Sequence, residues 1–340
     1  ETALLELVNQ MDGRRDFSKV PNLIYRQNGK ITVNQPFYSE NINQLTAPNY
    51  DGFPLDLYLS PEPVLPVQFS RGCYYKDCAF CALTLDHQNF RQRDPGKTVD
   101  DLVWLKERYG AQSFFFTDEC FALSPTKRLC QQMIDRQVNV KWTCELRFEK
   151  NLTRELLGQM RDAGCLKIVF GLESFNQRVM DFMKKGIKQE SVRRIVDDCV
   201  DLGIAVHCYV IVGFPTEKEE EALDTMNFVV GNKKLHESYG FSCQPCLFDL
   251  EKEAPIMSDP GSYGIRRIMR PATEDLSLGF FYEVQEGMTP AQAEQLYQQV
   301  YEKISEVVCE LPFNYSMADG LLYIARAKSQ ALQVPQPTGS

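Results

Sequence analysis

The chain has 340 residues, and 46 acidic residues against 37 Lys and Arg leave a net charge of −9. Hydrophobic residues make up 44% and charged residues 24% of the sequence, which excludes a disordered, collagen-like or disulfide-scaffold chain. The acidic balance argues against broad nucleic-acid binding, which requires a basic face.

The cysteine content is high, at 12 residues. No basic segment followed by an apolar run marks a signal peptide, and no stretch of about 18 apolar residues predicts a membrane span. We therefore expect a cytoplasmic protein with reduced thiols, some of which bind a metal, and without membrane partners.

Residues 1–62 are predicted to be an N-terminal linker. A short helix is expected over residues 4–11, followed by a hairpin over residues 23–33. Asn28-Gly29 suits a type I′ turn between two alternating strands. The prolines between residues 48 and 66 favour extended chain over helix.

Residues 63–250 alternate between apolar, strand-like runs and amphipathic helical patterns. Buried strands that alternate with helices predict a parallel sheet with right-handed crossovers. Strands are expected at residues 67–70, 113–117, 140–144, 166–170, 206–212 and 240–243.

Several residues mark expected helix starts. Thr98 can cap a helix with Asp101 three residues on, Ser124 precedes a proline, and Thr153 opens another helix. Further helices are expected from residue 217 onward, over 189–202 with Gly203 as its end, and over 290–309.

The predicted fold is α/β, a partial (β/α)6 TIM-like barrel over residues 63–250. Residues 251–340 are predicted to form a mixed, mainly helical C-terminal extension. In such barrels the functional site lies at the carboxyl ends of the strands.

Cys73, Cys78 and Cys81 form a C-x4-C-x2-C motif directly after the first predicted strand. Three thiolates on a short loop can bind three irons of a [4Fe–4S] cluster and leave the fourth iron open for a ligand. A zinc site completed by His87, or three reduced structural cysteines, are the alternatives.

Ser70-Arg71-Gly72 before this motif resembles the radical S-adenosylmethionine (radical SAM) superfamily, and more narrowly its branch that often carries a cobalamin-binding domain. The resemblance covers roughly residues 20–265 and is specific only when its motifs are taken together. Further matching stretches lie at residues 20–25, 116–119, 142–147, 170–174, 183–186 and 211–217.

The sequence departs from this family in two ways. The cysteine spacing is one residue longer than the commonest C-x3-C-x2-C, which we interpret as a subfamily variant. No Asp-x-His-x-x-Gly motif of a cobalamin domain is present. Residues 1–62 look like the linker that would follow such a domain, so cobalamin is expected only through a domain that this chain lacks.

The resemblance implies that the cluster reduces S-adenosylmethionine to give a 5′-deoxyadenosyl radical, which abstracts hydrogen from a C–H bond of a peptide or small molecule. An electron donor such as flavodoxin or ferredoxin is then expected. The reaction is either cobalamin-assisted methylation or a cobalamin-free epimerisation, cyclisation or rearrangement. A zinc-stabilised binding module is the alternative from another class.

Carboxylates follow four successive predicted strands, and this pattern does not depend on the resemblance. Acceptors at one rim suit an ammonium group, a sulfonium and ribose hydroxyls. They are Asp118 and Glu119, Glu145, Glu173, and Glu217.

Other cofactor-binding residues are predicted at the same rim. Thr117 and Ser174 lie within the matching stretches, and Arg147 is the nearest cation for the cofactor carboxylate. By the resemblance, Phe80 meets the adenine through its backbone, and Gly213 and Pro215 let the backbone approach the adenine.

Each of these residues also has a structural alternative. Glu217 suits the first turn of a helix, and Glu173 and Ser174 suit a helix cap. Asp118 and Glu119 can be solvated loop charges. Arg147 can form an ion pair with Glu145 or Glu149.

The remaining cysteines are mostly expected to be small buried side chains. Cys243 and Cys246 form a C-x-x-C motif, which suggests an auxiliary cluster or a redox pair. Cys120 or Cys246 is a candidate hydrogen-atom donor to a substrate radical. His207 lies inside a predicted strand and is expected in the core.

Overall fold

The computed structural model describes two compact units, residues 1–45 and residues 46–340. In the first, α1 (Thr2–Asp12) and a short 3₁₀ helix (Phe17–Lys19) precede a hairpin of β1 (Ile24–Gln27) and β2 (Lys30–Val33). Positive φ angles at Asn28 (51°) and Gly29 (79°) confirm the predicted turn. The described residues are 1–13, 15–36, 40–58, 60, 62–83, 89–237, 241–270, 278–307, 322, 324 and 326.

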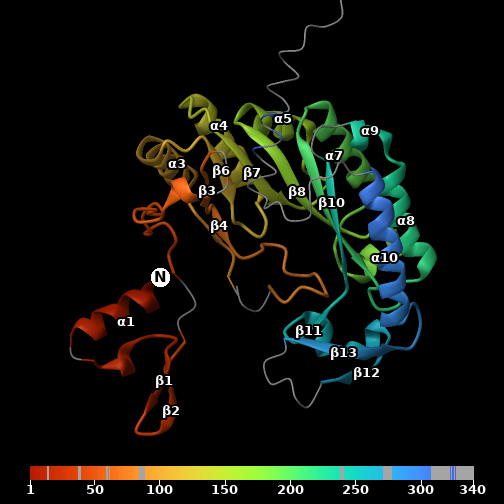
Figure 1. The fold of residues 1–340 in the computed structure, drawn as a ribbon, viewed down its shortest axis with the longest axis horizontal. Coiled ribbons are helices and arrows are strands. Elements are labelled where there is room, and N and C mark those ends of the chain that lie inside the picture. The colour runs from red at the N-terminus through yellow and green to blue at the C-terminus, as the bar shows by residue number, and fades with distance from the viewer. Residues whose placement is uncertain are drawn as a thin grey trace, which may run out of the picture. The chain divides into compact units, whose positions relative to one another are not determined.

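A six-stranded parallel sheet forms the centre of the second unit (Figure 1). Its strand order is β10-β9-β8-β7-β6-β3, so each strand pairs with the strand of this sheet that follows it along the chain. This confirms the predicted α/β fold with a partial barrel. The strands are β3 (Val64–Val67), β6 (Ser113–Phe116), β7 (Lys141–Leu146), β8 (Cys165–Glu173), β9 (Ala205–Val212) and β10 (Ser242–Leu247).

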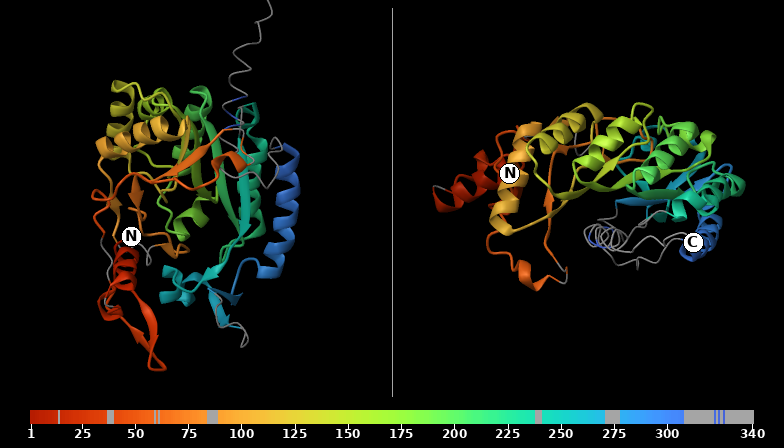
Figure 2. Two further views of the ribbon diagram at one scale, coloured as in Figure 1. Left: turned by 60° about the vertical axis from the view of Figure 1, so that its left-hand side comes forward. Right: turned by 90° about the horizontal axis from the view of Figure 1, so that it is seen from above.

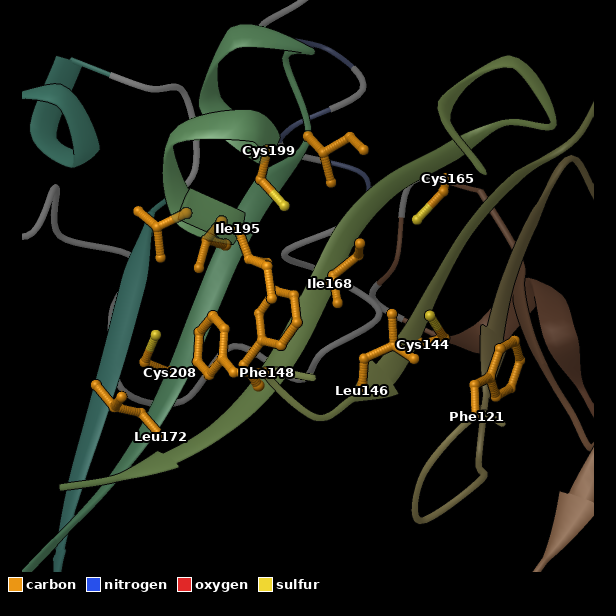
Figure 3. Packing of buried hydrophobic residues seen from close by; sticks show 14 of the residues in the cluster. Phe121, Cys144, Leu146, Phe148, Cys165, Ile168, Leu172, Ile195, Cys199 and Cys208 are labelled. Carbon is orange, nitrogen blue, oxygen red and sulfur yellow. The ribbon is translucent and has the colours of Figure 1, made fainter. Parts of the chain in front are cut away.

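Helices cover the convex side of this curved sheet (Figure 2). Alternate strand residues, such as Cys144, Ile168 and Cys208, pack under the helices in one large apolar core (Figure 3). We call this side of the sheet the outer face and the opposite side the inner face. The helices after the strands are α3 (Pro95–Tyr109), α4 (Leu123–Asp135), α5 (Arg154–Asp162), α6 (Gln177–Phe182), α7 (Gln189–Asp201), α8 (Glu219–Gly231) and α9 (Lys233–Glu237).

The C-terminal extension contains more strand than we predicted. A three-stranded antiparallel sheet of order β11-β13-β12 precedes α10 (Pro290–Val307), which confirms the predicted helix and packs against α8 and β10. The sheet has its own apolar core with Ile211 and Phe214. Its strands are β11 (Leu250–Glu251), β12 (Ile265–Met269) and β13 (Gly279–Val284), and two 3₁₀ helices (Pro255–Ser258 and Pro260–Tyr263) separate β11 from β12.

The first and last strands of the parallel sheet begin or end at other residues than we predicted. The first ends at Val67, and Ser70–Arg71 instead forms β4, which pairs with β5 (Arg91–Gln92). The last continues to Leu247, so Cys246 lies inside β10 rather than after it.

Two predicted helix caps were wrong. Asp94 caps α3 by accepting a hydrogen bond from the Lys97 amide, and Thr98 lies in the first turn. The helix begins at Pro95 because proline is preferred as the first helical residue. α4 begins at Leu123 with no side-chain cap, whereas Thr153 caps α5 as predicted.

The described helices include none that is both long and apolar enough to cross a membrane. The cysteines among the described residues are all free thiols. Most lie in the apolar core, as expected for small buried side chains.

Gly164, at the turn between α5 and β8, provides a test of this packing. Its φ is +98°, and a Cβ there would collide with the carbonyl oxygen of Val140. We expect Gly164→Ala to lower the free energy of unfolding by about 2 kcal/mol or more, measured by urea denaturation.

Gly158→Ala is the matched control. It lies inside α5 with open space around its Cβ position, so the same change should stabilise by up to about 1 kcal/mol. Equal effects at both positions would contradict the described turn.

Candidate functional site

The loop that carries the three cysteines leaves the carboxyl end of β3 and is anchored by Asp118. The Asp118 carboxylate, only 2% exposed, accepts hydrogen bonds from the Phe69 amide (2.9 Å), the Ser70 amide and the Ser70 hydroxyl (2.7 Å). Burial raises the pKa of Asp118 to about 7, against the lowering effect of these bonds. Asp118 thus positions the start of the loop through Phe69 and Ser70.

Other anchors hold the rest of the loop. Glu119 accepts a hydrogen bond from the Gly72 amide at 3.0 Å. The backbone of Ala79 bonds to Met183 on one side (2.9 Å) and to Ile256 of the extension on the other (2.8 Å). These hydrogen bonds therefore hold the cysteine loop near both of its ends.

The three cysteine thiols lie among positive charges. Arg147, 5% exposed, donates a hydrogen bond to the Cys78 sulfur at 3.7 Å and lies over the Tyr75 ring. Burial raises the pKa of Cys78, and the charges of Lys185 and Arg147 oppose this rise. These cations favour thiolates, the form that binds iron.

Cys120 lies beside Cys73. A hydrogen bond from Cys120 lowers the pKa of Cys73 to about 6, while the same bond and burial raise that of Cys120 well above its ordinary value. Burial raises the pKa of Cys81 to about 11. The predicted hydrogen-donor role of Cys120 remains a prediction.

The donor set fits a [4Fe–4S] cluster. Three soft thiols on one loop, next to Arg147 and Lys185, supply ligands and charge compensation. Within the described ranges, no three His, Cys, Asp or Glu side chains converge on a single ion position. A cluster does not need such convergence because each cysteine binds its own iron. His87, the proposed fourth zinc ligand, lies outside the described residues.

An acidic rim adjoins the cysteine loop. Lys185 pairs with Glu173 at 2.7 Å and lies 5.5 Å from the centre of the Phe80 ring. Burial raises the pKa of Glu145 to about 7, and the charges of Glu119 and Glu173 add to it. These predicted residues are thus brought together at one end of the barrel.

Two predicted residues point elsewhere. Ser174 is fully buried, and its hydroxyl contacts that of Thr225 on α8 (3.3 Å) and accepts from the Asn176 amide. Thr117 bonds to the carbonyl oxygen of Val67. Asn176 caps α6, so the helix-cap alternative for Ser174 was wrong, and its cofactor role remains a prediction.

The segment after β9 is tightly built around Gly213. Gly213 has a φ of +86°, and a Cβ there would collide with Ala293 of α10. Its amide donates to Glu217 at 2.7 Å. Pro215 and Glu217 are both buried, and the second carboxylate oxygen of Glu217 has no hydrogen-bond partner in the described part of the chain. Glu217 precedes α8, which begins at Glu219.

Cys243 and Cys246 do not form a pair. They lie three residues apart on β10, so their side chains point to opposite faces of the sheet. Cys243 is in the outer core, and Cys246 is exposed on the inner face, with its thiol 3.3 Å from the Val210 carbonyl oxygen. The redox-pair interpretation was therefore wrong.

Comparison with known proteins identifies a family that matches part of the chain. Residues 67–229, slightly less than half of the chain, match the model of the radical SAM superfamily. This segment is similar to a radical SAM domain.

Relatives of the radical SAM domain are longer proteins. An uncharacterized methyltransferase of Pyrococcus horikoshii is 28% identical over 244 residues, 70% of this chain and 52% of that protein. An anaerobic magnesium-protoporphyrin IX monomethyl ester cyclase of Rubrivivax gelatinosus is 30% identical over 160 residues, 46% of this chain and 29% of that protein. The chain thus spans about half or less of these curated relatives.

A solved structure supports the fold. The radical S-adenosylmethionine methyltransferase TsrM from Kitasatospora setae, solved with cobalamin and a [4Fe–4S] cluster bound, aligns with a TM-score of 0.65 and 18% identity. The alignment covers 97% of this chain and 75% of that one. At this identity the match shows the fold alone.

Sequence reasoning missed one charged residue of the radical SAM domain's rim. Lys185 is 6% exposed, pairs with Glu173 and faces Cys78 and Phe80. It lies in the stretch 183–186, which resembles the family. However, a lysine that follows Lys184 on a loop is ordinarily expected to be exposed to solvent. Only the fold shows that it turns inward.

Glu217 predicts a pH dependence of stability. Burial raises its pKa from the ordinary 4.5 to about 8, so the folded state holds a proton that the unfolded state releases. Stability from this group is complete below pH 4.5 and is lost as the pH rises to about 8. The free energy of unfolding should therefore fall as the pH rises through this range. Glu217→Gln should make this fall less steep, by at most about 1.4 kcal/mol per pH unit.

The free energy of unfolding will still fall with pH in this variant, because burial also raises the pKa values of Asp118 and Glu145. Glu219→Gln, an exposed change at the start of α8, is the control and should keep the wild-type slope. Urea unfolding from pH 5 to 8 measures all three proteins. An unchanged slope in Glu217→Gln would exclude a buried, protonated Glu217.

Proposed function

We propose that this chain is the catalytic core of a radical SAM enzyme, with Cys73, Cys78 and Cys81 as the ligands of a [4Fe–4S] cluster. The observation that carries the proposal is the anchored cysteine loop at the carboxyl end of the barrel, where Arg147 donates to Cys78. When bound, the cluster supplies the electron that cleaves S-adenosylmethionine, and the resulting radical attacks a C–H bond of the substrate.

The chain's own residues would bind and orient the cofactor. Glu145 and Glu173 provide acceptors for the ammonium and ribose groups, and Arg147 and Lys185 provide cations near the cofactor carboxylate. Phe80, whose ring centre lies 5.5 Å from the Lys185 ammonium, would meet the adenine through its backbone. The packed extension behind Gly213 closes one side of the rim against water.

Among the possible reactions, we favour methyl transfer assisted by cobalamin. Two of the compared proteins are named methyltransferases, and one of them holds cobalamin and a cluster. The domain that would bind cobalamin is proposed to lie in a part of the protein, or in a partner, beyond this chain. A cyclisation is the second candidate, because another relative is named a cyclase.

We propose that the protein acts in the cytoplasm, where its many free thiols stay reduced. A flavodoxin or ferredoxin would deliver the electron. The substrate is a small molecule or a peptide, and we expect no nucleic-acid or membrane partner. The net charge of −9 supports this expectation for nucleic acids.

Replacing Cys73, Cys78 and Cys81 together by Ala should abolish iron, labile sulfide and 5′-deoxyadenosine formation in anaerobically reconstituted protein, because no thiolates remain to bind the irons. Cys246→Ala removes an exposed thiol on the inner face and should retain iron. Iron that survives the triple change, or one zinc per chain without sulfide, would reject the proposal.

The reaction branch can be tested by product analysis. Anaerobic incubation of the full-length protein, or of this chain together with its cobalamin-binding partner, with S-adenosylmethionine, a reductant and cobalamin should yield S-adenosylhomocysteine along with 5′-deoxyadenosine if methyl transfer is correct. A reaction without cobalamin gives the control. Formation of 5′-deoxyadenosine alone in both would favour the cobalamin-free reactions.

A further inference from the structure

A second polar group lies deeper in the barrel, away from the cysteine loop. Thr143 of β7 pairs in register with Lys167 of β8, and His207 of β9 pairs with Ser242 of β10. Val169, two residues from Lys167, pairs with His207. The register thus places Lys167 and His207 as diagonal neighbours on adjacent strands.

These side chains face the inside of the barrel. Successive strand residues point to opposite faces. Trp142, Ile168 and Val206 belong to the core under the helices, so their neighbours Thr143, Lys167 and His207 point to the inner face. The four residues of the group are therefore on the concave surface of the sheet.

Two hydrogen-bonding atoms of this group have no partner among the described residues. His207 is 8% exposed, and its Nδ1 lies 2.7 Å from the Ser242 hydroxyl, while its Nε2 is buried and unpaired. The buried hydroxyl oxygen of Thr143 is also unpaired. Because a buried polar group without a partner costs free energy, both atoms are suited to a ligand.

Lys167 adds a cation to these groups. It is 4% exposed, and no carboxylate in the described part of the chain forms an ion pair or hydrogen bond with it. Burial lowers its pKa to about 8, so it remains mostly protonated at pH 7. Burial, and then the charge of Lys167, lowers the pKa of His207 to about 3, so His207 stays neutral. A buried cation without a counterion is costly.

We propose that Lys167, His207 and Thr143 form a subsite for an anionic group of the substrate, a carboxylate or a phosphate. An ammonium, an imidazole N–H and a hydroxyl are donors that converge on several oxygens of one anion. With the Ser242 hydroxyl donating to Nδ1, the Nε2 nitrogen of His207 carries the hydrogen that faces the ligand.

The position of the subsite also orients the substrate, an argument that rests on the proposed function. Lys167 and Glu173 lie six residues apart on β8, roughly 20 Å along a strand. The anionic group is held deep in the barrel, and the reacting carbon lies toward the cysteine loop. The site thus selects an extended substrate with a charged end far from the C–H bond that reacts.

Anion binding to the full, cluster-loaded chain tests the subsite without any turnover. The midpoint of urea unfolding is measured with sodium phosphate, sodium acetate or sodium chloride at constant ionic strength. We expect phosphate or acetate to raise the wild-type midpoint above that in chloride, and the stronger of the two identifies the group. Lys167→Met should weaken this binding at least tenfold.

The ligand-free proteins provide a second readout. Because Met removes an unpaired buried charge, Lys167→Met should unfold at a higher urea concentration than wild type in chloride. Lys127→Met, an exposed change on α4, should leave both readouts unchanged. Thr143→Val and His207→Gln, which should also weaken anion binding, keep the test valid where Lys167→Met does not fold.

Three outcomes would overturn the subsite: no anion-specific shift in wild type, the same shift in Lys167→Met (or, where that variant does not fold, in both Thr143→Val and His207→Gln), or a lower urea midpoint than wild type in a folded Lys167→Met without ligand. The last would mean that Lys167 already has an acceptor. Anion binding that persists in a protein unable to form 5′-deoxyadenosine would reject the proposed function and leave the subsite intact.

Discussion

The cysteine loop depends on a carboxylate that is not its own. After β3 the chain leaves the parallel sheet, and the amides of Phe69 and Ser70 are buried beyond its last strand pair. Buried amides need acceptors, and Asp118, at the end of the next strand, supplies them. Glu119 and the backbone at Ala79 extend the same anchoring across the loop. The position of all three cysteines follows from these bonds.

The inner face of the barrel is electrically divided. Near the carboxyl ends, Lys185 pairs with Glu173 and lies near Glu145, and Arg147 pairs with Glu149, so each cation has an acid beside it. Deeper in the barrel, Lys167 is a buried cation that forms no ion pair with an acid among the described residues. In the low dielectric of the protein interior, an unpaired buried charge is stabilised when a ligand of opposite charge binds and neutralises it. A cofactor at the rim and an anionic substrate group below it would use both regions.

The sheet and its site end were predictable because buried parallel strands are short apolar runs between helices. The runs around Phe115 and Val169 could be read in this way. Helix starts were less predictable, since Asp94 and Thr98 are both good caps and Pro95 decided between them. The antiparallel sheet of the extension was missed because β12 and β13 carry charged residues and are only partly buried, so they lack the continuous apolar run of the parallel strands. His207 was expected in the core, and burial alone did not show that its Nε2 lacks a partner.

The amino-acid sequence by itself determined the parallel fold, the cysteine motif and the row of acids, because hydrophobic period and residue spacing are local properties. The tertiary structure decided how each charge is used. Asp118 bonds to the loop, Ser174 turns to α8, and Lys185 turns inward to Glu173. These outcomes depend on which groups are buried together, and residues far apart in the chain set both the partners and the pKa values.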